Sequence, residues 1–320
     1  MNSTAADIAG EAGASAAPPA ARPLFGTLVT LVRREFWEHR ALWLCPVVVA
    51  GLLVLSALVM RANVNLGADG SIRVGHFLAS QQKVALFTIA QWALWMPIGL
   101  AATIVLCFYA LDCLYAERKD RSILFWKSLP VSDGMTVASK ALVAIILVPL
   151  GAYALALVTG LAFSALFAVR ATFGYAPPVL SWNGLEWLRA EFAMLLLLIL
   201  GVLWTAPVTA YLMLVSALSR RNPFVWALLP PLVGSLLERI VLGTHYLWDF
   251  LVYRTLGIWH ILDVEHSHVV TDNGLRPFGT LLNELNWRGA FGSIDLWLGI
   301  AATVAMLYGA VRLRRYRDES

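Results

Sequence analysis

Charged residues are scarce in this chain of 320 residues: 14% are Asp, Glu, Lys or Arg, whereas 59% are hydrophobic. An ordinary soluble domain has about 25% charged and about 45–50% apolar residues, so the composition indicates an integral membrane protein. The three cysteines, Cys45, Cys107 and Cys113, lie within or beside apolar segments, which excludes a disulfide framework in an exported loop. A phosphate-binding G-x-x-x-x-G-K-[ST] loop is also missing, so no motif indicates that this chain hydrolyses a nucleotide.

The N-terminal segment, residues 1–23, is rich in Ala, Gly, Ser and Pro. It has no apolar core of the kind that a signal peptide needs, and we expect it to be a disordered cytoplasmic tail. The rest of the chain, 24–320, shows no internal repeat and no soluble domain, so it is predicted to form one transmembrane domain.

Six apolar segments are long enough, or nearly so, to cross a bilayer core of about 30 Å as helices. They run roughly from Ala41 to Met60, Gln91 to Leu111, Ala141 to Val169, Phe192 to Ser219, Pro223 to Leu242 and Ile294 to Val311. The fifth is the weakest, because Pro230-Pro231 interrupts it and Glu238-Arg239 lies at its far end. The predicted fold is all-α, with six transmembrane helices. The short link Arg220 to Pro223 predicts that the fourth and fifth helices are antiparallel neighbours.

The distribution of basic residues predicts the orientation, because cytoplasmic segments carry an excess of Lys and Arg. With both termini inside, 15 of the 24 basic residues are cytoplasmic and nine lie in the longer outer loops. The cytoplasmic set is Arg22, Arg33, Arg34, Arg40, Arg118, Lys119, Arg121, Lys127, Lys140, Arg220, Arg221, Arg312, Arg314, Arg315 and Arg317. We therefore expect a multi-pass protein of the cell (inner) membrane whose basic loops contact lipid head groups, and no nucleic-acid partner.

Two segments outside the spans have patterns of their own. Before the first span, apolar residues recur at helical spacing and predict an amphipathic helix in the membrane interface. These residues are Phe25, Leu28, Val29, Val32 and Phe36. Before the last span, the outer segment 243–293 begins with Tyr246 to Leu262, which is apolar but interrupted by charges. We interpret that part as a re-entrant or interfacial helix.

The central loop, 114–140, is the most informative segment. A charged run from Glu117 to Arg121 is followed by Ser122, a possible helix N-cap, and then by an apolar patch that ends at Leu129-Pro130. The patch contains Ile123, Leu124, Phe125 and Trp126. Ser132 is placed to cap the next helix. The pattern suggests a docking surface on the cytoplasmic face, and the alternative is a juxtamembrane helix that lies on lipid.

With these features in this order, the chain resembles the type-2 permease family of ATP-binding-cassette transporters. The resemblance is carried by the amphipathic helix before six spans, the pair Glu117-Arg118 that closes the second span, and the turn Leu129 to Ser132 that leads to Lys140. It implies an elbow helix at the N-terminus, a coupling helix at Ser122 to Ser128 in a groove of a separate ATPase subunit, and a dimer with a second permease copy or paralogue. The ATPase-coupling residues would be Glu117, Arg118, Ser122, Leu124, Phe125, Trp126, Leu129 and Pro130. The chain itself would not be an enzyme and would need no cofactor.

Two other function classes stay open. His260, Asp263, Glu265, His266 and His268 resemble a zinc ligand set, which would suit a membrane enzyme, although a solvated loop explains the same residues. A membrane sensor or immunity protein without transport is the third class. Candidate gating residues are Asp112, Glu238 and Arg239, since ionisable groups at membrane depth are often functional. For Asp112 the alternative is a carboxylate that snorkels to the head groups or forms a salt bridge near Lys140 or Arg34.

Overall fold

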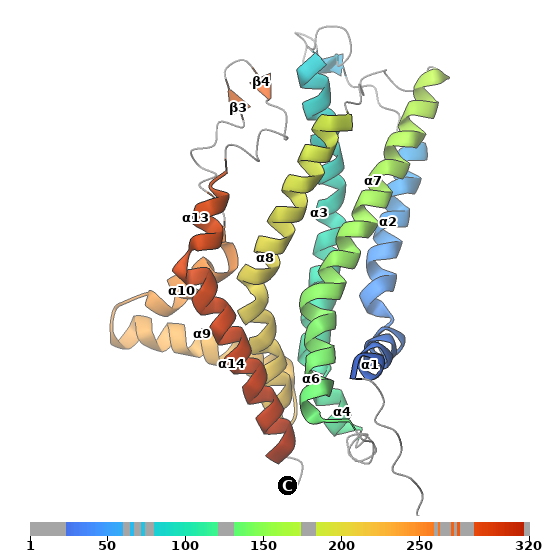
Figure 1. Cartoon of the computed structure of the whole chain (residues 1–320). Helices are drawn as coiled ribbons and strands as arrows, with labels where there is room; N and C mark the ends of the chain where they lie inside the picture. Colours follow the sequence, from blue (N-terminus) through green and yellow to red (C-terminus); the bar gives the residue numbers. More distant parts are fainter. Residues whose placement is uncertain are drawn as a thin grey trace, which may run out of the picture.

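The computed structural model describes residues 24–59, 65–66, 72–73, 80–120, 131–173, 184–258, 262, 270–271, 274–275 and 285–316. Most of these residues are helical, and two antiparallel pairs of very short strands, β1 with β2 and β3 with β4, complete the described structure (Figure 1). The elements are α1 (Leu24–Glu38), α2 (Ala41–Val59), β1 (Asn65–Leu66), β2 (Ile72–Arg73), α3 (Ser80–Asp112), α4 (Tyr115–Lys119), α6 (Asp133–Leu142), η1 (Val143–Leu147), α7 (Val148–Thr172), α8 (Gly184–Leu218), α9 (Pro223–Val241), α10 (Tyr246–Leu256), β3 (Val270–Thr271), β4 (Gly274–Leu275), α13 (Trp287–Gly292) and α14 (Ile294–Tyr316).

Six of the described helical segments are long and apolar enough to cross a membrane. They are Ala41–Val59, Gln91–Lys119, Asp133–Arg170, Trp187–Leu218, Pro223–Val241 and Ile294–Tyr316. The prediction of a mainly helical, multi-pass membrane protein with six such helices is therefore confirmed. The second and third segments are longer than expected, because α3 continues into α4 and because α6, η1 and α7 follow one another without a break.

The start of the third span follows the predicted cap. Ser132 has an extended backbone, and its hydroxyl accepts a hydrogen bond from the backbone N of Met135 at 3.2 Å. This bond satisfies one of the amide groups that the first turn of a helix leaves unpaired. Farther along, η1 is a π-helical turn that ends two residues before Pro149, whose ring has no N–H to donate to the preceding turn.

Small residues bring the long helices together. The main core lies between α2, α3, α7, α8 and α14, and alanine is its commonest buried residue. The buried alanines are Ala50, Ala102, Ala110, Ala141, Ala144, Ala152, Ala156, Ala217 and Ala310. Because lipid chains are as apolar as leucine, helices in a membrane associate through close packing, which small side chains allow. Many larger apolar side chains, such as Leu52, Leu100 and Val158, are exposed on the outside of the bundle, as expected for contact with lipid.

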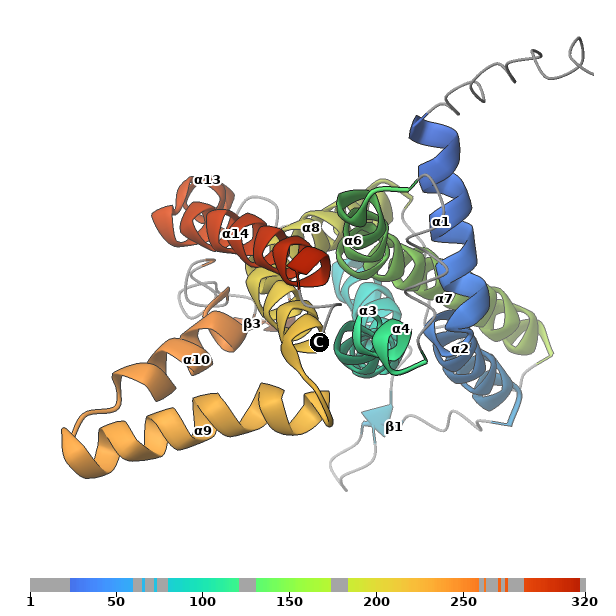
Figure 2. The same ribbon diagram turned by 90° about the horizontal axis from the view of Figure 1, so that it is seen from below.

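The direction of α9 differs from the prediction. We expected α9 to run antiparallel to α8, but it leaves the bundle sideways, and α10 returns beside it (Figures 1 and 2). Only the start of α9 packs against the bundle: Ala227 is buried, and its carbonyl accepts a hydrogen bond from the hydroxyl of Tyr211 at 3.0 Å. A short link brings the ends of two helices together without setting the angle between their axes. Packing near Ala227 sets that angle here.

A second core holds the segment after α9 against the bundle. Leu200 and Trp204 of α8 pack with Leu262, Leu285, Ala290 and Leu296. The guanidinium of Arg254, in α10, lies over the Trp204 ring at 4.5 Å and donates to the backbone carbonyl of Asp295 at 3.0 Å. The helical part of the predicted segment Tyr246 to Leu262 is confirmed for α10, while its re-entrant or interfacial placement stays a prediction.

The predicted amphipathic helix before the first span is also helical, as α1. Figure 2 shows it lying across the end of the bundle, beside α2, and it contacts α6. Phe25 and Val29, on the expected apolar face, are exposed, whereas Leu31 and Glu35 are buried against the bundle, and the placement of α1 in the membrane interface stays a prediction. A carboxylate at the centre of the buried face requires partners from other helices.

Candidate functional site

Lys140 is the centre of a buried ion network at one end of the bundle. Its side chain is fully buried, and its Nζ lies 2.7 Å from Oε1 of Glu35 in α1 and 3.2 Å from Oε1 of Glu117 in α4. Both carboxylates are buried as well. A buried ammonium group needs paired charge and hydrogen-bond acceptors, and two carboxylates from separate helices meet that need.

Arg314, near the end of α14, extends the network. It forms an ion pair with Oε2 of Glu117, and its Nε lies 3.0 Å from Oδ1 of Asp133 at the start of α6. Arg34 of α1 approaches Oε1 of Glu117 at 4.0 Å. Cations from α1, α6 and α14 therefore surround the single carboxylate of Glu117.

The second oxygen of Glu35 connects α1 to α3. The hydroxyl of Tyr109 donates a hydrogen bond of 2.9 Å to Oε2, and Nε2 of His39 lies 3.9 Å from the same oxygen. Glu35, Glu38 and His39 bring potential metal ligands within 4.8 Å of one another. Because Lys140 and Tyr109 already engage both oxygens of Glu35, these residues are better explained as part of the ion network than as a metal site.

The environment of His39 predicts a pH-dependent stability. Burial lowers the pKa of His39, and the nearby carboxylate of Glu35 opposes this effect. The folded protein therefore favours the neutral ring. The contribution of His39 to the stability of the fold is fully present above the ordinary histidine pKa of about 6.5, and it is lost as the pH falls below that value. We expect the melting temperature to fall more steeply between about pH 7.5 and pH 5.5 in the wild type than in His39→Gln.

The matched control is His245→Gln, the same substitution at an exposed histidine. Its melting temperature should follow the wild-type curve. If the melting temperatures of the wild type and His39→Gln change with pH in parallel, His39 does not contribute to the pH dependence of stability.

A second set of contacts joins α4 to the end of α8. The hydroxyl of Ser216, which is fully buried, accepts hydrogen bonds from the backbone N atoms of Leu114 at 3.1 Å and Tyr115 at 3.0 Å. In return, Nη2 of Arg118 donates to the backbone carbonyls of Ser216 and Ser219. Each contact satisfies backbone groups that a helix end leaves unpaired, so the start of α4 and the end of α8 cap each other.

The predicted coupling residues are partly placed. Glu117 and Arg118 lie at one end of the bundle and bond to α6, α14 and α8. The other predicted coupling residues, Ser122, Leu124, Phe125, Trp126, Leu129 and Pro130, lie outside the described residues, as does the histidine and carboxylate cluster from His260 to His268.

The candidate gating residues are not brought together. Asp112 is exposed, and within the described residues it does not form the salt bridge considered for it, because Lys140 bonds to Glu35 and Glu117 instead. Glu238 accepts hydrogen bonds from the backbone N of Tyr246 at 2.7 Å and of Leu247 at 2.8 Å. It therefore caps α10 across the turn from α9, while Arg239 beside it is exposed. A gating role for Asp112, Glu238 and Arg239 stays a prediction.

Several residues of the network are absent from the sequence-based prediction. They are Glu35, Tyr109, Asp133, Ser216 and, as a network member, Arg314. One signal was available: Glu35 follows the apolar Leu31 by four residues, so both lie on the same face of a helix. The others carry no local signal, because their partners lie far away in the sequence.

The network has a particular position relative to the central loop. Its members in α4 and α6 flank residues 121–130 on both sides, and they bond to α1 and α14. Comparison with known proteins adds no assignment: no family model, no curated protein and no solved structure matches this chain. The arrangement around residues 121–130 is therefore the basis for the functional proposal.

Proposed function

We propose that this chain is the membrane-spanning permease subunit of an ATP-driven exporter, and that residues 121–130 dock on a separate ATPase subunit. One observation carries the proposal: the helices on both sides of this segment belong to one buried ion network. α4 joins it through Glu117, and α6 joins it through Asp133 and Lys140. A force on the segment would therefore reach α1 and α14 as well as its two neighbours.

The same contacts suggest how movement would spread. α4 directly follows α3, and α6 continues through η1 into α7, so a displacement of the segment would tilt two long helices of the bundle. Paired buried charges move as a unit, because separating them leaves an uncompensated charge in an apolar environment. In this proposal ATP hydrolysis in the partner switches the permease between inward and outward access, while this chain makes no chemical bonds.

Orientation and assembly complete the proposal. The end of the bundle that contains the network also carries the arginines of α1 and the basic ends of α4 and α14, which supports placing it in the cytoplasm together with both termini (Figure 1). In the proposed exporter, α1 is the elbow helix in the inner-membrane interface. The segment from α10 to α13 forms the re-entrant part, and a second permease chain completes a dimer.

The test is co-purification with the ATPase. An apolar side chain that fills a groove of a partner contributes about 2–5 kcal/mol, and a few such anchors dominate an interface. We expect Phe125→Ala and Leu124→Asp to leave the permease inserted in the membrane but to release the nucleotide-binding subunit or to uncouple ATP hydrolysis from transport. Recovery of that subunit from detergent extracts and ATPase activity in vesicles are the measurements.

Phe25→Ala is the matched control, because Phe25 is an exposed aromatic residue on α1, at the same end of the bundle. It should retain the ATPase like the wild type. If Phe125→Ala and Leu124→Asp also retain it and transport normally, residues 121–130 are not the coupling element and the exporter proposal is rejected.

A further inference from the structure

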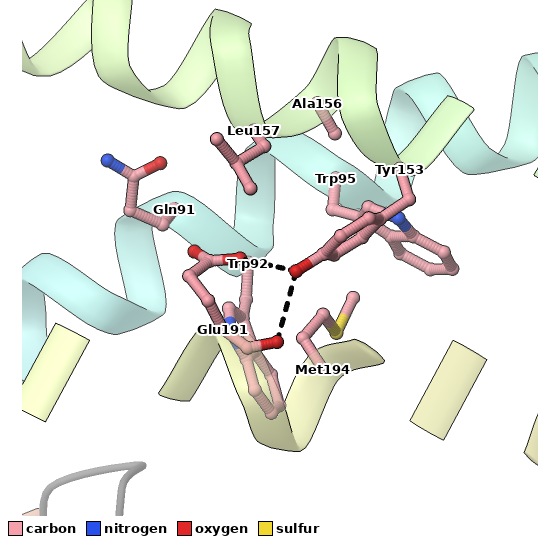
Figure 3. A pocket seen from close by; sticks show the side chains of 8 residues that line it. All are labelled: Gln91, Trp92, Trp95, Tyr153, Ala156, Leu157, Glu191 and Met194. Carbon is pink, nitrogen blue, oxygen red and sulfur yellow. Dashed lines mark hydrogen bonds between the residues drawn. The ribbon is translucent and has the colours of Figure 1, made fainter. Parts of the chain in front are cut away.

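A small pocket lies between α3, α7 and α8 (Figure 3). It is lined by Gln91, Trp92, Trp95, Tyr153, Ala156, Leu157, Glu191 and Met194. Glu191 is the only formally charged residue among them, and it lies four residues inside the span that begins at Trp187. At about 1.5 Å per residue, this places its Cα about 6 Å from that end.

The charge of Glu191 is not balanced by a cation in the described structure. Its carboxylate accepts a hydrogen bond from the hydroxyl of Tyr153, with 3.2 Å to Oε2, and it forms no ion pair with any described residue. The same hydroxyl also lies 3.0 Å from the backbone carbonyl of Glu191, so one proton serves two acceptors. An ionisable group inside a span is costly unless it is neutralised or paired, and it usually marks a functional position.

The remaining walls suit an organic cation. Trp92, Trp95, Tyr153 and Met194 line the pocket together with Glu191, and the Tyr153 hydroxyl points to the carboxylate (Figure 3). The negative faces of aromatic rings attract ammonium groups, most strongly where water is excluded. None of the described residues that line the pocket is basic, so among them an anion would meet only the repulsion of Glu191.

The pocket also lies beside the lipid-facing surface. Leu188 and Phe192, which flank Glu191 on α8, are more than half exposed on the outside of the bundle, at 59% and 54%. An amphiphile in the bilayer could therefore reach the pocket sideways, with its charged group near the end of the span and its apolar part along the helices.

We propose that this pocket binds the ammonium group of an amphiphilic amine, with Glu191 as the counter-charge, Tyr153 as the group that orients the carboxylate, and Trp92 and Trp95 as its aromatic walls. The claim that such amines are substrates of the transporter rests on the exporter function proposed above. The claim that the pocket binds an ammonium group rests on the geometry of the pocket alone. The narrow pocket favours a primary ammonium group, which can donate hydrogen bonds to the carboxylate, over a bulkier quaternary one.

The test uses two small probes of nearly equal shape, benzylamine and benzyl alcohol, with the purified full-length chain in phosphatidylcholine nanodiscs. Titration calorimetry at neutral pH, where benzylamine is protonated, should give saturable binding of benzylamine and none of benzyl alcohol. Glu191→Gln keeps the side-chain shape and removes the charge, so it should weaken benzylamine binding roughly ten- to hundredfold. Asp120→Asn, which removes an exposed carboxylate just after α4, is the matched control and should bind like the wild type.

Trp95→Leu provides a second variant that leaves the carboxylate in place and should weaken binding several-fold. Thermal unfolding of each variant checks that the fold is retained. Unchanged benzylamine binding by folded Glu191→Gln, or equal binding of benzyl alcohol by the wild type, would show that the pocket is an apolar hollow and would overturn the assignment. Because no ATPase is present, failure here is distinct from failure of the exporter proposal, which depends on residues 121–130.

Discussion

Replacing Lys140 by Met is expected to destabilise the protein by about 3–5 kcal/mol, because it leaves buried carboxylates without their shared cation. Glu35 suffers most: it loses the ion pair of 2.7 Å and keeps the hydroxyl of Tyr109 and the more distant ring of His39. Glu117 retains its ion pair with Arg314. The measurement is the denaturant or thermal unfolding of the purified protein, followed by tryptophan fluorescence.

Lys119→Met is the matched control, because Lys119 lies at the end of α4 and is exposed. A surface charge contributes about 0–1 kcal/mol, so this variant should unfold like the wild type. A double variant, Lys140→Met with Glu35→Gln, should recover part of the lost stability, because it removes the carboxylate that was left unpaired. Equal stability of Lys140→Met and Lys119→Met would mean that the network does not hold α1 and α4 to the bundle.

Removing the hydroxyl of Ser216 is expected to have the second-largest effect. In Ser216→Ala the backbone N atoms of Leu114 and Tyr115 lose their acceptor. A buried donor left without a partner costs about 1–3 kcal/mol, so the two together predict a loss of about 2–4 kcal/mol after partial relaxation. We also expect α4 to separate more readily from α8, which hydrogen exchange of the amides of residues 114–119 would measure.

Ser235→Ala is the control for this substitution. The Ser235 hydroxyl donates to the carbonyl of Leu232 within its own helix, so its removal leaves no donor without an acceptor between helices. Its unfolding and its exchange rates near α4 should match those of the wild type. Unchanged exchange in Ser216→Ala would show that Arg118 alone is sufficient to hold α4.

Local patterns predicted much of the local structure. Ser132 caps α6 as expected because capping depends on the residue type and its immediate neighbours. The resemblance to a known family pointed to Glu117 and Arg118, and both lie among the contacts at this end of the bundle, but it did not identify their partners. The prediction of a helix at α1 was confirmed, whereas the burial of Glu35 depends on partners from other helices and could not be predicted locally.

Longer-range features could not be predicted in this way. Arg314 and Asp133 are separated by 181 residues, and Lys140 and Glu35 by 105. Glu191 was overlooked because it lies just before the apolar run that begins at Phe192, where a charge is common at the end of a span. Only the approach of Tyr153 from α7 and of two tryptophans from α3 distinguishes it from an ordinary interfacial carboxylate.

Composition and segment length were enough to predict a helical membrane protein with six segments able to cross a bilayer, because the free energy of transferring each segment into lipid depends on that segment alone. Tertiary structure alone decided that α9 leaves the bundle sideways, that Lys140 joins Glu35 to Glu117, and that Glu191 faces an aromatic pocket. These features depend on which helix faces meet. Side-chain packing and charge pairing between distant segments decide which faces meet, and the sequence of a single segment does not contain this information.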